Sequence, residues 1–178
     1  MTNSFNNAGL FLISTLFNLY LVILAIRLIL AYARANYFNP LTQIIIKCTQ
    51  PLVAPLRRLF PTYRGIEFAT LIWIIIFEAA KIFLLSTLTF GMPYLTSLLL
   101  FSITDTLKLL LSTFFYAVLL RAILSWFQPS SSPASEWLEQ ISAPIMRPLQ
   151  RIIPPINGID ITPIPALIIL QLFIILLP

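Results

Sequence analysis

The ionisable side chains inside the apolar stretches of this sequence are the residues whose types and spacing could do chemistry. Glu78 and Lys81 are three residues apart, so a helix would place them on one face, where they can form an ion pair. Asp105 and Lys108 have the same spacing. The candidate intramembrane polar residues are Arg27, Glu78, Lys81, Asp105, Lys108, Arg121 and Gln171. Such residues support two interpretations, a polar clasp between helices or a path for an ion or a proton.

The composition indicates what kind of element holds these residues. The chain of 178 residues is 59% hydrophobic and 10% charged, with a mean hydropathy of +0.95. Soluble domains carry about 25% charged residues, so this chain has too little polar surface to coat a water-soluble fold. Three runs contain no charge, at residues 1–26, 82–104 and 161–178. We therefore expect an integral membrane protein.

Four apolar stretches are candidates for membrane spans. A bilayer-spanning helix needs roughly 20 mostly apolar residues, with about 17 to 25 tolerated. We predict spans at residues 9–33, 67–90, 104–127 and 161–178. Gly91, Met92 and Pro93 predict a break after the second span. The apolar piece at 94–103 is too short to span alone, so it either extends the third helix or lies in the interface.

Depth in the bilayer decides how each charge can be accommodated. Glu78 lies eleven residues into the second span, which is roughly 17 Å and near the midplane. It therefore needs a partner or must be protonated, and Lys81 on its own helix and Arg27 on a neighbouring helix are the competing partners. Arg27 lies about seven residues, or roughly 10 Å, from the cytoplasmic end of its span and can snorkel outward. Arg121 is similarly placed in the third span.

The sequence contains an internal repeat. The stretch PLVAPLRRLFPTYRGIE at 51–67 returns 93 residues later as PIMRPLQRIIPPINGID at 144–160, with seven of seventeen positions identical. Chance would give roughly one identity. Arg27 and Arg121 precede the two copies, and Gln171 stands where the first copy has Glu78. The chain therefore divides into a first repeat at 9–90, a connector at 91–103 and a second repeat at 104–178. Two spans in each repeat make the repeats parallel in the membrane.

Each repeat predicts a short amphipathic helix followed by a proline-rich elbow. Apolar side chains recur at helical spacing in both copies, at Leu41, Ile44, Ile45, Cys48 and Leu52, then at Trp137, Leu138, Ile141 and Ile145. We expect these helices to lie in the membrane interface and to end at Pro51 and Pro144, because proline removes an amide donor. The proline-dense segments that follow are expected to form stiff, partly extended corners. Gly65 and Gly158 would supply the backbone angles that other residues avoid.

The predicted fold class follows from these elements. It is an all-α membrane protein with four transmembrane helices in two tandem parallel repeats, each with a short amphipathic interfacial helix and a Pro-rich cytoplasmic elbow. Glu67 and Asp160 are expected to accept amide hydrogen bonds at the start of the next helix. The repeated segment is either a structural elbow or a paired docking surface for an anionic lipid or a cytoplasmic protein.

The distribution of basic residues predicts the orientation. Segment 34–66 carries five Lys or Arg residues and segment 128–160 carries two, whereas the N-terminal tail and segment 91–103 carry none. By the positive-inside rule both Pro-rich loops face the cytoplasm. We predict a multi-pass protein of the cell inner (plasma) membrane with both termini in the periplasm.

Several chemistries are absent from the sequence. The chain has no histidine, and Cys48 is its single cysteine, so Ser-His and Cys-His pairs, disulfides and multi-thiolate metal sites are excluded. No Gly-rich phosphate loop occurs. The net charge of +5 comes from arginines that flank the spans, so it reflects membrane topology rather than nucleic-acid binding. We expect a non-enzymatic protein with no cofactor.

The doubled pattern P-x3-P-L-x-R-x2-P-x3-G-I-[DE], with an arginine in the preceding apolar helix, resembles the YggT/YlmG family of small membrane proteins. The residues that carry the resemblance are Pro51, Pro55, Arg58, Pro61, Gly65, Glu67, Pro144, Pro148, Arg151, Pro154, Gly158 and Asp160. It covers nearly the whole chain in the two-unit form of many proteobacteria, and Glu67 departs from the usual Asp. The resemblance implies an integral membrane protein linked to osmotic stress and to division or envelope organisation, with plastid relatives tied to nucleoid distribution.

Two functions are therefore expected from the sequence. The first is an organiser or accessory factor in the osmotic-stress response or in cell-division and envelope organisation. Its cytoplasmic loops would contact anionic lipid headgroups, a cytoplasmic or membrane protein, or a second copy of the chain. The alternative is a small ion channel or transporter, or a subunit of one, with a polar path through Glu78, Lys81 and Arg27.

Overall fold

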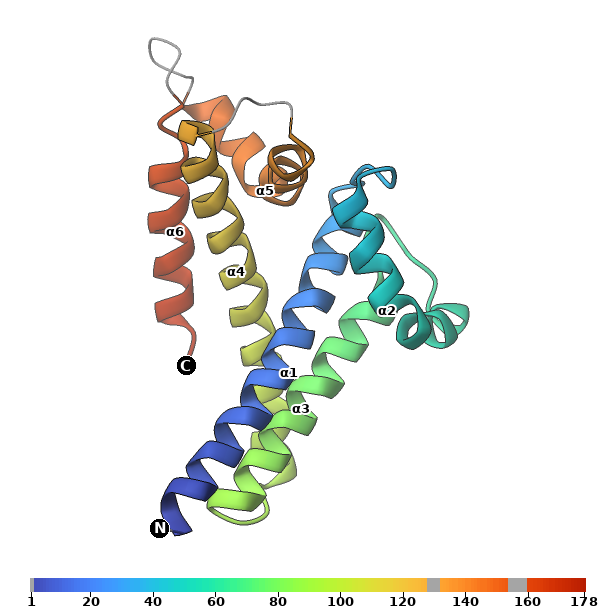
Figure 1. The fold of residues 1–178 in the computed structure, drawn as a ribbon, viewed down its shortest axis with the longest axis vertical. Coiled ribbons are helices and arrows are strands. Elements are labelled where there is room, and N and C mark those ends of the chain that lie inside the picture. Colours follow the sequence, from blue (N-terminus) through green and yellow to red (C-terminus); the bar gives the residue numbers. More distant parts are fainter. Residues whose placement is uncertain (1, 128–131, 154–159) are drawn as a thin grey trace.

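The chain is helical throughout the part that the structure describes. A computed structural model covers residues 2–127, 132–153 and 160–178, and within these ranges it contains six helices and no strand beyond one isolated bridge. The helices are α1 (Thr2–Tyr32), α2 (Pro40–Leu59), α3 (Phe68–Thr89), α4 (Leu95–Phe127), α5 (Pro133–Ile152) and α6 (Pro163–Leu176) (Figure 1). The predicted all-α class is confirmed.

Three of the helices are long and apolar enough to cross a membrane. These stretches are Asn6–Tyr32 in α1, Phe68–Thr89 in α3 and Leu95–Ser125 in α4. Helix α6 is equally apolar but has 14 residues, or about 21 Å of helix. Because α4 begins at Leu95 and runs without a break, segment 94–103 extends the third predicted helix rather than forming a separate interfacial piece.

The long helices pack in a chain of antiparallel neighbours. Helix α1 packs mainly against α3, α3 also packs against α4, and α4 packs against α5 and α6. The core between α1 and α3 is apolar, with Leu21, Leu24 and Ile74 fully buried. Helices α2 and α5 lie at the same end of the molecule, opposite the turn that joins α3 to α4 (Figure 1). Both Pro-rich segments are therefore on one side.

Helices α2 and α5 continue through their prolines, so the predicted breaks at Pro51 and Pro144 are wrong. Helix α2 runs to Leu59 with Pro51 and Pro55 inside it, and α5 contains Pro144 and Pro148. Two prolines four residues apart remove amide donors from one side of a helix only. The backbone hydrogen bonds on the opposite side of the helix can continue. The helix therefore bends instead of ending, as Figure 1 shows for α2 and α5.

The apolar stripes predicted for α2 and α5 face different surroundings. In α2 the side chains of Ile44 and Cys48 are exposed, while Thr42 and Thr49 are buried. In α5, by contrast, Leu138 and Ile141 are buried in a core cluster that also includes residues of α1 and α4. The stripe of α2 is thus only partly buried, with Ile45 and Leu52 packed against core clusters, whereas the stripe of α5 holds the two halves of the molecule together.

A tight turn, rather than a long proline corner, connects α2 to α3. The backbones of Tyr63 and Ile66 exchange two hydrogen bonds of 3.1 and 3.0 Å. Between them Arg64 and Gly65 have φ angles of 51° and 87°, which is the pattern of a two-residue type I′ turn. The expected backbone of Gly65 is confirmed. The corresponding predictions for Pro154 and Gly158 lie outside the described residues.

Candidate functional site

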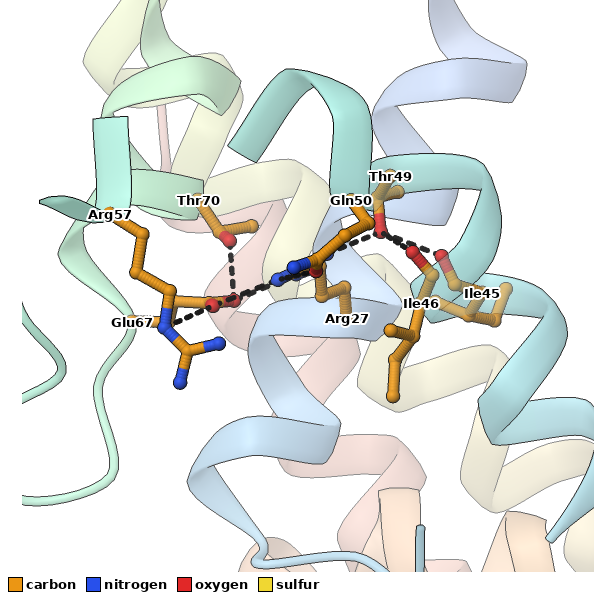
Figure 2. Close-up of polar contacts among 8 residues, drawn as sticks. All are labelled: Arg27, Ile45, Ile46, Thr49, Gln50, Arg57, Glu67 and Thr70. Carbon is orange, nitrogen blue, oxygen red and sulfur yellow. Dashed lines mark hydrogen bonds and ion pairs between the residues drawn. The ribbon is translucent and has the colours of Figure 1, made fainter. Parts of the chain in front are cut away.

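A buried ion pair between Arg27 and Glu67 is the centre of the first half. The Arg27 side chain lies in the C-terminal part of α1, and Glu67 immediately precedes α3. Arg27 Nε donates to Glu67 Oε2 at 2.8 Å and Nη2 donates to Oε1 at 2.9 Å, so the pair is bidentate (Figure 2). The side chains are 6% and 5% exposed. Such fork-to-fork pairing is the strong form of the interaction.

Polar side chains of α2 and α3 complete the hydrogen bonds of the pair. Arg27 Nη1 donates to Thr49 Oγ1 at 2.8 Å, and Nη2 donates to Gln50 Oε1 at 3.2 Å. Thr70 Oγ1 donates to Glu67 Oε2 at 2.6 Å. Figure 2 shows these side chains converging from three helices. The cluster therefore ties α1, α2 and α3 together at one end of the bundle.

The electrostatic environment favours the ionised form of Glu67. Burial raises the pKa of this carboxyl, but hydrogen bonds from Arg27 and Thr70 and the charges of Arg27 and Arg57 outweigh burial and hold the pKa below its ordinary value. Arg57 Nε contributes from 3.7 Å. The buried negative charge is fully compensated, so the cluster is a structural ion pair rather than a reactive base.

A small cavity adjoins the pair. It has a volume of about 30 Å³ and is lined by Arg27, Glu67, Tyr37 and Thr42, among others. Within the described residues, the buried Thr42 Oγ1 has no hydrogen-bond partner. A cavity of this size can hold a water molecule, which polar neighbours of this kind would bind.

The second half of the chain contains a related set of polar contacts, made by Arg121 and Asp160. Arg121 Nη1 donates to Ser142 Oγ at 3.2 Å, and Gln150 Nε2 donates to Asp160 Oδ2 at 2.8 Å. Asp160 Oδ1 also accepts from the backbone of Thr162 at 3.0 Å. Burial raises the pKa of Asp160, but the hydrogen bonds from Thr162 and Gln150 and the charge of Arg121 lower it below its ordinary value. Asp160 is exposed, so this set is closer to solvent than the first.

Two predictions about this region need correction. Glu67 occupies the N-cap position of α3 but makes no side-chain capping bond, because Arg27 and Thr70 take both carboxylate oxygens. Arg27 does not snorkel outward, and its carboxylate partner is Glu67 rather than Glu78. Asp160 does accept an amide hydrogen bond next to its helix, as predicted.

A second polar group lies deeper in the bundle. Glu78 is buried and its Oε2 lies 2.5 Å from Lys81 Nζ, which confirms the predicted pairing. Lys81 also donates to Asn18 Oδ1 of α1 at 3.1 Å. Glu78 lies eleven residues after Glu67, which is about 17 Å of helix. The fully buried Leu21, Leu24 and Ile74 occupy the interval, so Arg27 and Glu78 belong to separate clusters.

The remaining polar residues of the spans are dispersed. Asp105 and Lys81 line one open cavity between α3 and α4 near the end that carries the α3–α4 turn. Lys108 Nζ donates to the carbonyl oxygen of Pro178 rather than pairing with Asp105. Gln171 is exposed on α6. These residues do not converge on one point.

Most motif residues of the repeated segment lie on the surface. Arg58 and Arg151 are exposed, as are Pro51, Pro55, Pro61 and Pro148, while Pro144 is half-buried. Sequence reasoning missed Thr49, Gln50, Thr70 and Asn18, which bind the charged groups. One signal was available, since Thr49 and Ser142 are hydroxyl residues at the 93-residue offset of the repeat and each accepts a hydrogen bond from an arginine.

Comparison with known proteins finds one family over most of the chain. The sequence model of the family described as CCB3/YggT matches residues 6–88 and again residues 100–178. An uncharacterized protein of Pseudomonas aeruginosa, PA0392, is 36% identical over 170 residues, which cover 94% of this chain and 86% of that protein.

Two further relatives are also similar over most of the chain. An uncharacterized protein encoded in the proC 3′ region of Vibrio alginolyticus is 35% identical over 93% of this chain and 90% of its own length. The uncharacterized protein YggT of Escherichia coli K12 is 32% identical over 95% of this chain and 87% of its own length. No solved structure matches the chain.

Proposed function

The chain belongs to the CCB3/YggT family, and from this premise we propose that it is a four-span inner-membrane protein that organises components at the cytoplasmic surface without catalysis. Its processes would be the osmotic-stress response or cell-division and envelope organisation. Its partners would be anionic lipid and a cytoplasmic or membrane protein. Helix α6 with its flanks, within the uncharged run 161–178, is the fourth span.

Two observations support the tandem parallel repeats in this proposal. The family matches the two halves of the chain separately, at residues 6–88 and 100–178. Each half also has an arginine that donates to a hydroxyl residue of the following amphipathic helix, Thr49 in α2 and Ser142 in α5. A repeated contact of this kind is what two copies of one unit would make.

The exposed charge supports the proposed orientation and carries the proposed function. Seven basic side chains are exposed at the end that holds α2 and α5, namely Arg34, Lys47, Arg57, Arg58, Arg64, Arg147 and Arg151. The exposed acids described at that end are Glu136, Glu139 and Asp160. A net basic surface next to membrane spans suits the cytoplasmic face and attracts anionic lipid or an acidic partner. Both chain termini would then lie in the periplasm.

The channel alternative has less support. It requires a polar path that joins Arg27 to Glu78 and Lys81, whereas each of these charges already has a partner within its own cluster. The apolar core between the two clusters is packed with fully buried side chains. We therefore do not adopt conduction as the proposed function.

The proposal is tested by complementation of a bacterial strain that lacks the protein. Replacement of Arg58 and Arg151 by Gln removes two exposed charges of the repeated motif and should abolish rescue of growth or cell shape after an osmotic upshift. Glu78→Gln should retain rescue, because Gln171 already occupies the matching position.

Flux through liposomes that contain the purified protein supplies the discriminating control. An organiser should give the same K⁺, Na⁺ and H⁺ flux as empty liposomes under an osmotic step. Flux that Glu78→Gln abolishes, together with lost rescue by that variant, would overturn the organiser proposal in favour of conduction.

A further inference from the structure

A groove lined by three arginines lies between the two halves at the α2–α5 end. Its walls come from the end of α1, from the turn at residues 63–66 and from α5, and its volume is about 370 Å³. Arg34, Arg64 and Arg147 line it together with Tyr32, Pro144 and Pro148. The groove is separate from the Arg27–Glu67 cluster and does not include the motif arginines Arg58 and Arg151.

The backbone on either side of the groove brings two of these arginines to one place. Arg34 ends the turn after α1 with a φ of 52°, and Arg64 has a φ of 51° in the turn before α3. These left-handed conformations are uncommon for residues other than glycine. A Cβ on Gly65 would lie 3.4 Å from the carbonyl oxygen of Tyr32, so the second turn packs directly on the end of α1. Arg64 thereby reaches the groove beside Arg34.

The three guanidinium groups have no carboxylate partner among the described residues. Among the described residues, ion pairs join Arg27 and Arg57 to Glu67, and Lys81 to Glu78. No acidic residue lines the groove. The Arg64 guanidinium lies over the ring of Tyr63, at 5.4 Å from the ring centroid. Three like charges that share a groove without a counter-charge repel one another, and each offers N–H donors that suit a phosphate.

The position of the groove identifies the source of that phosphate. Tyr32 is the last residue of the apolar stretch Asn6–Tyr32, so the groove begins where α1 would leave the hydrocarbon core. Proline and tyrosine side chains form its other walls, which suits the glycerol end of a lipid better than a fully hydrated ion. We propose that the groove binds the phosphate headgroup of an anionic phospholipid from the adjacent leaflet. This inference rests on the proposed membrane placement and deepens the proposed lipid contact.

The arginines of the groove are not repeated in the sequence. Arg147 corresponds to Ala54, and Arg64 corresponds to Asn157, at the 93-residue offset. The arginines come from both halves, so the groove forms only where the halves meet. One tightly bound lipid per chain is therefore expected.

Native mass spectrometry of the full chain, released from neutral detergent, tests the proposal. Wild type should keep one phosphatidylglycerol in preference to phosphatidylcholine, with apparent affinity for the anionic lipid at least about tenfold higher. The variant Arg34→Gln/Arg64→Gln/Arg147→Gln should lose this preference. Two single substitutions form a matched pair. Arg147→Gln should weaken phosphatidylglycerol binding several-fold. Lys47→Gln, at an exposed site on α2, should change that binding less than twofold.

Each contrary outcome identifies a different error. Equal losses in Arg147→Gln and Lys47→Gln would mean diffuse charge attraction and would overturn the groove. Displacement of the lipid by an equal concentration of glycerol phosphate would make it a site for soluble phosphate and would overturn the lipid assignment. Arg147→Lys, which keeps the charge and the fold of α5, should retain part of the preference. The complementation assay is independent of lipid binding. If wild type shows no preference for phosphatidylglycerol but still rescues growth, the groove proposal is refuted and the proposed function is not.

Discussion

Arg27 is stable in an apolar bundle because its partners come from three separate segments. Its carboxylate partner is forty residues away in sequence, and two further acceptors come from α2. No spacing rule links residues so far apart, so sequence reasoning could flag the charge but could not choose between a snorkelling arginine and one paired with Glu78. The antiparallel packing of α1 and α3 decides the pairing, because it places the end of α1 beside the start of α3.

Removal of the charge on Glu67 is expected to destabilise the protein strongly. Glu67→Gln leaves the buried Arg27 without its counter-charge, a change that costs about 3 to 5 kcal/mol in buried pairs. The matched control is Asp160→Asn, at the corresponding position of the second half, where an exposed carboxylate should contribute less than about 1 kcal/mol. Denaturation in detergent, followed by circular dichroism, measures both. Equal losses in the two variants would contradict the buried role of Glu67.

The same pair predicts how stability depends on pH. The pKa of Glu67 is lower in the folded protein than its ordinary value of 4.5, so below that pH the unfolded chain binds more protons than the folded one. The stabilisation is therefore complete above about pH 4.5 and is lost as the pH falls further toward the folded pKa. Thermal unfolding from about pH 7 to about pH 3 should show this decline. The decline should be weaker in Glu67→Gln, and equal slopes would contradict the assignment.

At the scale of elements, the long apolar helices could be predicted and the proline-rich helices could not. Long apolar stretches predict α1, α3 and α4 directly, because a continuous helix satisfies its own backbone hydrogen bonds inside a membrane. The sequence pattern predicts that the second helix ends at Pro51, whereas α2 continues for eight further residues. Proline costs roughly 3 kcal/mol in a helix interior. Packing of the opposite face, where Thr49 and Val53 are fully buried, offsets that cost and has no local sequence signal.

The turn before α3 gives a prediction about glycines. Gly65→Ala should lower the free energy of unfolding by more than about 1 kcal/mol, because a Cβ is unfavourable at its φ of 87°. Gly91→Ala shares the unfavourable backbone, at φ 101°, so a comparable loss is expected there although its Cβ would meet open space. Gly9→Ala in α1 should stabilise by about 0.5 to 1 kcal/mol. Chemical denaturation of the three variants gives the order, and a neutral Gly65→Ala would contradict the turn.

At the scale of the whole molecule, polar contacts join the two halves at the α2–α5 end. Asn39 Nδ2 donates to the carbonyl oxygen of Pro133 at 2.8 Å, and the backbone N–H of Asn36 donates to Gln140 Oε1 at 3.0 Å. The repeat in the sequence could predict that there are two similar units. It could not predict how they meet, because these contacts join residues 94 and 104 positions apart that lie outside segments 51–67 and 144–160.

The orientation of the whole molecule can be read from its single cysteine. Cys48 is exposed on α2, so in intact cells a membrane-impermeant maleimide should leave it unlabelled if that end is cytoplasmic. Tyr94 is exposed in the turn between α3 and α4, at the opposite end. The variant Cys48→Ser/Tyr94→Cys should therefore react from outside. Labelling of Cys48 in intact cells, with protection of residue 94, would reverse the proposed topology.

Helix α4 connects the turn at one end of the molecule with α5 and α6 at the other, and its apolar stretch is 31 residues long. That is about 46 Å of helix, against a hydrocarbon thickness of about 30 Å. Such a hydrophobic mismatch is relieved by tilting the helix or by deforming the bilayer around it. The 22 residues of α3, about 33 Å, require no such adjustment. In the proposed membrane placement, α4 therefore needs a larger tilt than α3 to fit the same hydrocarbon thickness. The unequal lengths of these two neighbouring helices would thus give them different tilts in one bilayer.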